Sequence, residues 1–160
     1  MINPTNEKVR DAIVSLGYDL NSMKGVKGTF YTTDRLRDLK AAVAEILILR
    51  HLSDDLRKTA WRGDQLRNLK PLAGYCYVVA EAGREILGHD WKPSQVRVDG
   101  VSHWFLKHES TGAIFDPTQG QFDRPVPYDK ARNCGFLTKT PCKRTMVLLE
   151  RIRKTRCVSK

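Results

Sequence analysis

The chain has 160 residues and a formal net charge of +10, from 28 lysines and arginines against 18 aspartates and glutamates. This length allows one domain with a hydrophobic core and is too short for two ordinary domains. A hydrophobic content of 41%, with 8% aromatic residues, excludes a chain that is disordered throughout. The longest apolar run, residues 41–49 interrupted by Glu45, is far shorter than the roughly 20 residues of a membrane span.

The cysteines and the N-terminus favour a cytoplasmic protein with reduced thiols and no bound cofactor. The sequence that starts at Met1 does not resemble a secretory signal, and no two cysteines form a C-x-x-C pair. The chain has four cysteines, which are widely spaced: Cys76, Cys134, Cys142 and Cys157. Thiols in such a setting are usually reduced.

Helical periodicity dominates the first half of the chain. Apolar spacing predicts helices over residues 6–16, over residues 33–52 and, after a short helical turn and a connector, over residues 74–87. Gly88 is expected to end the third helix, as glycine often does. Most of these apolar stripes are expected to be core packing. Together the first two helices form an expected helical N-terminal portion, residues 1–60.

The second half predicts a small antiparallel sheet and a final helix. After a break at Trp91-Lys92-Pro93, residues 95–98 alternate as a strand, and an Asp-Gly turn leads into a hairpin over residues 103–116. The final helix, residues 143–153, is expected to bury three apolar side chains: Met146, Leu149 and Ile152. The whole chain is thus expected to be one α+β domain, with a helix packed on the sheet.

The hairpin places His103 and Asp116 on one face. Alternate side chains of a strand share a face, and a turn centred on Glu109-Ser110 or on Ser110-Thr111 pairs Asp116 with His103 or with Phe105. In either register the imidazole and the carboxylate are close enough to touch. A histidine oriented by a carboxylate is a general base that lacks only a nucleophile.

Cys76 is the candidate nucleophile. It lies in the first turn of the predicted helix 74–87, where free amide hydrogens and the helix dipole favour a thiolate. Two small residues, Ala80 and Gly83, share its face and let another group approach closely. Each residue also has an ordinary interpretation, as a buried thiol, a strand histidine or a turn aspartate. Zinc binding by Cys76, His103 and either Cys134 or Cys142 is a further alternative.

These motifs resemble those of the transglutaminase-like and papain-like cysteine proteins. A cysteine in an apolar helix is followed by His103-Trp104 and by a strand that ends in Asp116-Pro117-Thr118. The segment 116–122, Asp-Pro-Thr-Gln-Gly-Gln-Phe, is closer still to small uncharacterised YunG-type proteins. The resemblance covers residues 72–122 and implies a core over residues 61–128.

The resemblance implies a chemistry for the three residues. Cys76 would attack an amide or ester, His103 would transfer the proton and Asp116 would orient His103. Three neighbours are candidate contacts for the substrate or the oxyanion: Gln121, Tyr75 and Trp104. Gln121 could instead cap its own loop. Tyrosines flank Cys76 where transglutaminases usually have a tryptophan, and Trp104 follows the histidine directly, so transfer to an amine is not implied over hydrolysis.

The C-terminal region, residues 129–160, suggests a different function. It holds ten basic and two acidic residues, a net charge of +8. Such a tail attracts phosphates or acidic proteins by electrostatics that do not depend on sequence, or it simply aids solubility. The alternative to an enzyme is therefore a basic module that binds nucleic acid or an acidic partner through four residues: Arg144, Arg151, Arg153 and Lys154.

Overall fold

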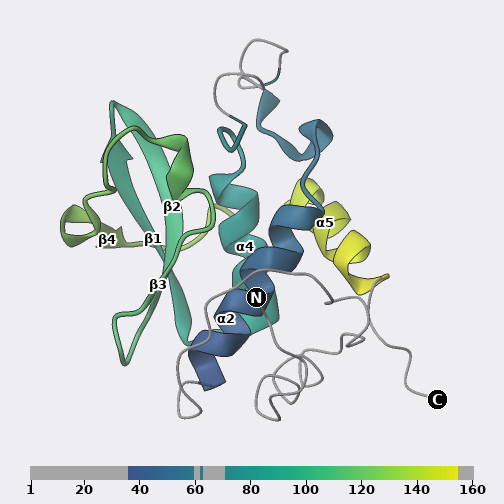
Figure 1. Cartoon of the computed structure of the whole chain (residues 1–160), viewed down its shortest axis with the longest axis horizontal. Coiled ribbons are helices and arrows are strands. Elements are labelled where there is room, and N and C mark those ends of the chain that lie inside the picture. The colour runs from purple at the N-terminus through teal and green to yellow at the C-terminus, as the bar shows by residue number, and fades with distance from the viewer. Residues whose placement is uncertain (1–35, 60–61, 63–70, 155–160) are drawn as a thin grey trace.

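The computed structural model describes residues 36–59, 62 and 71–154, and Figure 1 shows their arrangement. Its α-helices are α2 (Leu36–Arg50), α4 (Cys76–Leu87) and α5 (Lys143–Arg153). The strands are β1 (Trp91–Val98), β2 (Val101–His108), β3 (Ile114–Phe115) and β4 (Arg132–Asn133), and three short 3-10 helices are η2 (Asp54–Leu56), η4 (Gln119–Gln121) and η5 (Tyr128–Lys130). The helix predicted over residues 6–16 lies outside the described residues. No helix of the described part is both long and apolar enough to cross a membrane.

The strands form one antiparallel sheet in the order β3-β2-β1-β4. The hairpin of β1 and β2 is its centre, with Val98 opposite Val101 at the turn and Trp91 opposite His108 at the far end. Helix α4 packs on this sheet, mostly on β2. The predicted α+β class, with a helix on a small antiparallel sheet, is confirmed.

Strand β1 is longer than the sequence predicts. The expected break at residues 91–93 is wrong, because the strand begins at Trp91 and includes Pro93. The carbonyl of Pro93 accepts a hydrogen bond of 3.0 Å from the amide of Cys134, so its nitrogen also faces the β4 side. Strand β4 pairs only with Ser94 and Gln95. The amide hydrogen that proline lacks is therefore missing just where the pairing with β4 ends.

Helix α4 is the central layer, between the sheet on one side and α2 and α5 on the other (Figure 1). One hydrophobic cluster joins all of these elements. It includes Val43, Leu47 and Ile48 of α2, Val78, Val79 and Ala82 of α4, Trp91, Leu106 and Phe115 of the sheet, and Leu148 and Ile152 of α5. The N-terminal portion, the predicted core and the C-terminal helix thus contribute to the same hydrophobic core.

The opposite face of the sheet is covered by the segment that follows β3. Val96, Val98 and Phe105 pack there against Val126, with the ring of Tyr128 beside Phe105. His103 lies on this face too, because it is directly opposite Val96 and directly paired residues of two strands point their side chains to the same face. The base of the candidate site is therefore enclosed by residues 116–131.

Helix α5 has the predicted bounds but a different buried face. Met146 is 54% exposed, and the residues that α5 buries are Thr145, Leu148 and Ile152. The expectation that Met146 is buried is therefore wrong. The cause lies in α4, where buried Glu81 accepts hydrogen bonds from the Thr145 hydroxyl at 2.8 Å and from the Cys142 amide at 3.1 Å. These bonds set the rotation of α5 about its axis.

The small residues of α4 allow it to lie close to the sheet. A Cβ added at Gly83 would meet an atom of the Phe115 ring at 2.6 Å and one of Leu106 at 3.1 Å. We expect Gly83→Ala to destabilise the protein by about 1–3 kcal/mol through overpacking, despite the better helix propensity of alanine. Urea unfolding measures the change. Gly135→Ala is the matched control, since a Cβ there meets no atom within 4 Å, and equal stability of the two variants would contradict the close packing.

Candidate active site

Cys76 is the first residue of α4, directly after the N-cap Tyr75. The first amide groups of a helix have no acceptor within the helix, so they point free hydrogens toward its N-terminal end. The Cys76 side chain is half-buried and lines a cavity of about 590 Å³. The predicted nucleophile therefore lies at a helix N-terminus and borders an open space.

The predicted contact between His103 and Asp116 is confirmed. Nε2 of His103 lies 2.7 Å from Oδ2 of Asp116, and both side chains are buried. Leu106 pairs with Phe115 and Lys107 with Ile114, which corresponds to the register with the turn centred on Ser110-Thr111. Because β3 pairs with only two residues of β2, the chain leaves the sheet at Asp116, and the carboxylate reaches along the edge to His103.

The surroundings of His103 favour the protonated ring. Burial lowers its pKa, but the hydrogen bonds to Asp116 and to Cys76, and the negative charges on these two groups, outweigh burial and raise the pKa to about 9. An imidazolium next to a sulfur favours the thiolate, which is the nucleophilic form of cysteine. Both other members of the predicted set thus act on the charge of His103.

Asp116 has a second partner that the sequence did not suggest. The hydroxyl of Tyr128 donates a hydrogen bond of 2.8 Å to Oδ2, the same oxygen that contacts His103. Burial and then the charge of Asp116 raise the pKa of Tyr128, so the phenol stays a donor. Burial and the same charge also raise the pKa of Glu45 in α2. Tyr128 begins the three-residue helix η5, which is too short for a periodic pattern to indicate this contact.

Gln121 caps its own loop and also lies at the cavity. Its Nε2 donates to the carbonyl of Thr118 at 3.2 Å, which caps the turn of η4. The same nitrogen lies 3.4 Å from Nδ1 of His103, and the side chain lines the cavity. An amide in this position is next to both the imidazole and the space in which a substrate would lie.

The structure separates the two aromatic candidates. Trp104 lines the cavity, stacks on Phe136 at 5.8 Å and meets the ring edge of Tyr77 at 5.0 Å. Tyr75 does not line this cavity and is buried in the core. Two helical positions separate Tyr75 from Tyr77, so their side chains point to nearly opposite sides of α4. Tyr77, rather than Tyr75, is the tyrosine at the cavity.

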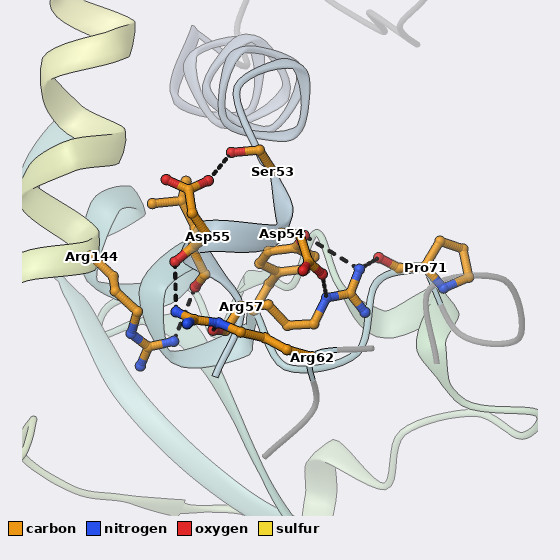
Figure 2. A network of polar contacts seen from close by, with 9 residues as sticks. Ser53, Asp54, Asp55, Arg57, Arg62, Pro71 and Arg144 are labelled. Atoms are coloured by element: carbon orange, nitrogen blue, oxygen red, sulfur yellow. Dashed lines mark hydrogen bonds and ion pairs between the residues drawn. The ribbon is translucent and has the colours of Figure 1, made fainter. Parts of the chain in front are cut away.

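Tyr75 instead contacts a polar network around Arg57 at the start of α4. Figure 2 shows this network with Asp54, Arg57, Pro71 and Arg144 labelled. Buried Arg57 pairs with Asp54 at 3.2 Å and donates to the carbonyl of Pro71 at 3.1 Å and to the Tyr75 hydroxyl at 3.3 Å. Its guanidinium also lies 4.7 Å from the centre of the Tyr75 ring. From α5, Arg144 donates to the carbonyl of Leu56 at 3.0 Å. The network thereby joins η2, α5 and the segment that leads to Cys76.

The basic residues of the C-terminal region have different surroundings. Arg144 lines the cavity, whereas Arg151 pairs with Asp55 at 2.7 Å and Arg153 bonds to Glu150 at 2.8 Å. Lys154 is exposed at the end of α5. The binding of nucleic acid or an acidic protein by this region stays a prediction.

The remaining cysteines do not gather around His103. Cys134 follows β4, and burial raises the pKa of its thiol. Cys142 precedes α5, lines the cavity and contacts the Thr145 hydroxyl at 3.3 Å. Cys157 lies outside the described residues. Among residues 36–59, 62 and 71–154, no group of three or more His, Cys, Asp or Glu side chains is arranged to hold a metal ion.

Comparisons of the chain with protein-family models, with curated proteins and with solved structures found no match.

Proposed function

We propose that the protein is a thiol hydrolase or acyl-transferase that attacks an amide or related acyl bond through Cys76. The observation that carries this proposal is the position of His103. Nε2 of the ring is held by Asp116 at 2.7 Å, and Nδ1 lies 3.4 Å from Gln121, which lines the cavity together with Cys76. Cys76 is close enough to the ring to help raise its pKa. A nucleophile, a base and a residue that orients the base are the parts of a covalent acyl-transfer site.

The first half-reaction forms an acyl-enzyme. With the proton already held on His103, the sulfur of Cys76 attacks the carbonyl carbon of the substrate, so that a C–S bond forms and the carbonyl oxygen becomes an oxyanion. The backbone amide of Cys76 and the side-chain amide of Gln121 are the donors proposed for this oxyanion. When the oxyanion collapses, the bond to the leaving group breaks, and the leaving nitrogen or oxygen takes the proton from His103.

The second half-reaction releases the acyl group. His103 removes a proton from water or from an amine, which attacks the thioester carbon. The C–S bond then breaks, and His103 keeps the proton beside the released sulfur. Asp116 holds the imidazole in one orientation throughout, as carboxylates do in such triads. Tyr128 in turn fixes the carboxylate.

The resemblance of residues 72–122 to transglutaminase-like and YunG-type proteins supports the same roles for Cys76, His103 and Asp116. That resemblance rests on short motifs, and the contacts of His103 support the assignment independently of it. Two aromatic rings, Tyr77 and Trp104, meet at the cavity beside Cys76.

An acylating thiol probe tests the proposal. We expect a broad thioester-forming probe to label the wild-type protein at Cys76, located by peptide mass spectrometry, and to leave Cys76→Ala unlabelled. Cys142→Ala is the matched control, because this second cysteine of the cavity is not in contact with an imidazole, and it should be labelled like the wild type. Label on Cys134 or Cys142 instead of Cys76, or equal labelling of Cys76→Ala, would rule out the assignment.

A further inference from the structure

Three cationic side chains line the cavity beside Cys76: Lys58, Arg97 and Arg144. No aspartate or glutamate is among the described residues of its wall. A cavity lined by charges of one sign and by apolar side chains focuses its electric field and attracts ligands of the opposite charge. The apolar part of the wall includes the rings of Trp104 and Tyr77.

These cations are not neutralised by carboxylates of the described residues. Arg97 donates one hydrogen bond, of 2.9 Å, to the carbonyl of Gly100, and Arg144 donates one of 3.0 Å to the carbonyl of Leu56. A guanidinium has five N–H groups in a planar fork, so each arginine keeps donors for a ligand. Arg151, outside the cavity, is different because it pairs with Asp55.

The cations come from both sides of the cavity. The backbone amide of Lys58 donates a hydrogen bond of 2.8 Å to the carbonyl of Gly74, which holds Lys58 next to the start of α4. Arg144 is held close to Lys58 because it donates a hydrogen bond to the carbonyl of Leu56, two residues before Lys58. Arg97 comes from the sheet, at the hairpin end of β1. An anion between these sides would also face the positive end of the α4 dipole.

We infer that the substrate of Cys76 is an acyl compound that carries a carboxylate or a phosphate, and that Lys58, Arg97 and Arg144 bind this anionic group. The inference rests on the proposed function, because it names the substrate class of the same site. Planar arginine forks match both carboxylate and phosphate oxygens. Some of the excess of basic residues in this chain would thus serve to bind substrate beside the nucleophile.

The charge of the cavity is tested without any enzyme activity. Iodoacetate and iodoacetamide differ by one negative charge and alkylate the same thiols. We compare the alkylation rate with iodoacetate divided by the rate with iodoacetamide. At low salt we expect this ratio at Cys76 to exceed the ratio at free glutathione at least about tenfold, and we expect it to fall as salt is added. Lys58→Gln and Arg97→Gln should each lower the ratio, whereas Lys107→Gln, on β2 but outside the cavity, should not.

The substrate preference is tested with two matched esters. The p-nitrophenyl ester of succinic acid has a free carboxylate, and its methyl ester is neutral. We expect the charged ester to acylate Cys76 at least about tenfold faster, with the preference reduced in Arg97→Gln and unchanged in Lys107→Gln. Protection of Cys76 by glutarate or by inorganic phosphate, at equal ionic strength, then distinguishes the two anions.

The outcomes separate the inference from the proposed function. Equal acylation by the two esters, or an alkylation ratio at Cys76 no higher than that of glutathione, overturns the anionic substrate and leaves Cys76 as the nucleophile. If neither ester acylates Cys76, the proposed function fails and the substrate class fails with it. Lys58→Gln and Arg97→Gln change exposed side chains, so the tests do not depend on Arg144, whose bond to Leu56 also supports the fold.

Discussion

Replacement of His103 by glutamine is expected to lower the rate at which an activated ester acylates Cys76 by about 10²–10⁴-fold, the usual contribution of a general base. The variant loses the proton acceptor and also the positive ring beside the sulfur. At the same time, the pH dependence of the rate should move toward that of a free thiol. Burst kinetics of p-nitrophenolate release measure the effect directly, because one equivalent of product reports one acylated thiol.

His108→Gln is the matched control for this experiment. His108 is a buried histidine of the same strand, but it packs on Trp91 at 5.0 Å and bonds to the hydroxyl of Ser110 at 3.1 Å, at the end of β2 far from the turn with β1. We expect it to keep the wild-type acylation rate as long as it is folded by circular dichroism. An unchanged rate in folded His103→Gln, or an equal loss in both variants, would show that His103 is not the base.

Asp116→Asn has the second large expected effect, on the charge of His103. The carboxylate both bonds to the ring and supplies a negative charge, and these contributions outweigh burial in raising the pKa to about 9. We expect the pKa of His103, measured by NMR titration of the ring, to fall well below 9 in the variant. Tyr128→Phe removes a hydrogen bond to Asp116 but leaves its charge, so His103 should keep a pKa above 6.5.

The same shift has a defined effect on stability. The pKa of histidine is about 6.5 in the unfolded chain, so a folded value near 9 stabilises the folded state fully below pH 6.5. This stabilisation, on the order of 3 kcal/mol, is lost as pH rises through about 9. Urea unfolding from pH 6 to pH 10 should show a decline that is smaller in Asp116→Asn. If the stability of the wild type and of Asp116→Asn declined equally with pH, or if wild-type His103 had a pKa near 6.5, the raised pKa of His103 would be contradicted.

The elements that the sequence predicted well are those set by local periodicity. Helix α5 has the expected bounds, and α4 differs from its expected start by two residues. The contact of His103 with Asp116 follows from strand parity, which puts both on one face whichever of the two turns forms. The placement of Cys76 at a helix start follows in the same way from the apolar stripe behind it.

The errors fall where distant segments meet. Pro93 is part of a strand because its nitrogen faces the point where β4 stops pairing. Met146 is exposed because Glu81, on another helix, binds Thr145 and turns α5. Neither contact has a local signal, since each depends on a residue about 40 or more positions away in the chain.

The sequence by itself determined the class of the fold, the helix that bears Cys76 and the pairing of His103 with Asp116, because each depends on spacing within one helix or one hairpin. Only the tertiary structure decided that Tyr128 holds Asp116, that Tyr77 replaces Tyr75 at the cavity, and that three distant cations share its wall: Lys58, Arg97 and Arg144. Periodicity states which residues share a face, but the packing of helices on the sheet decides what that face meets.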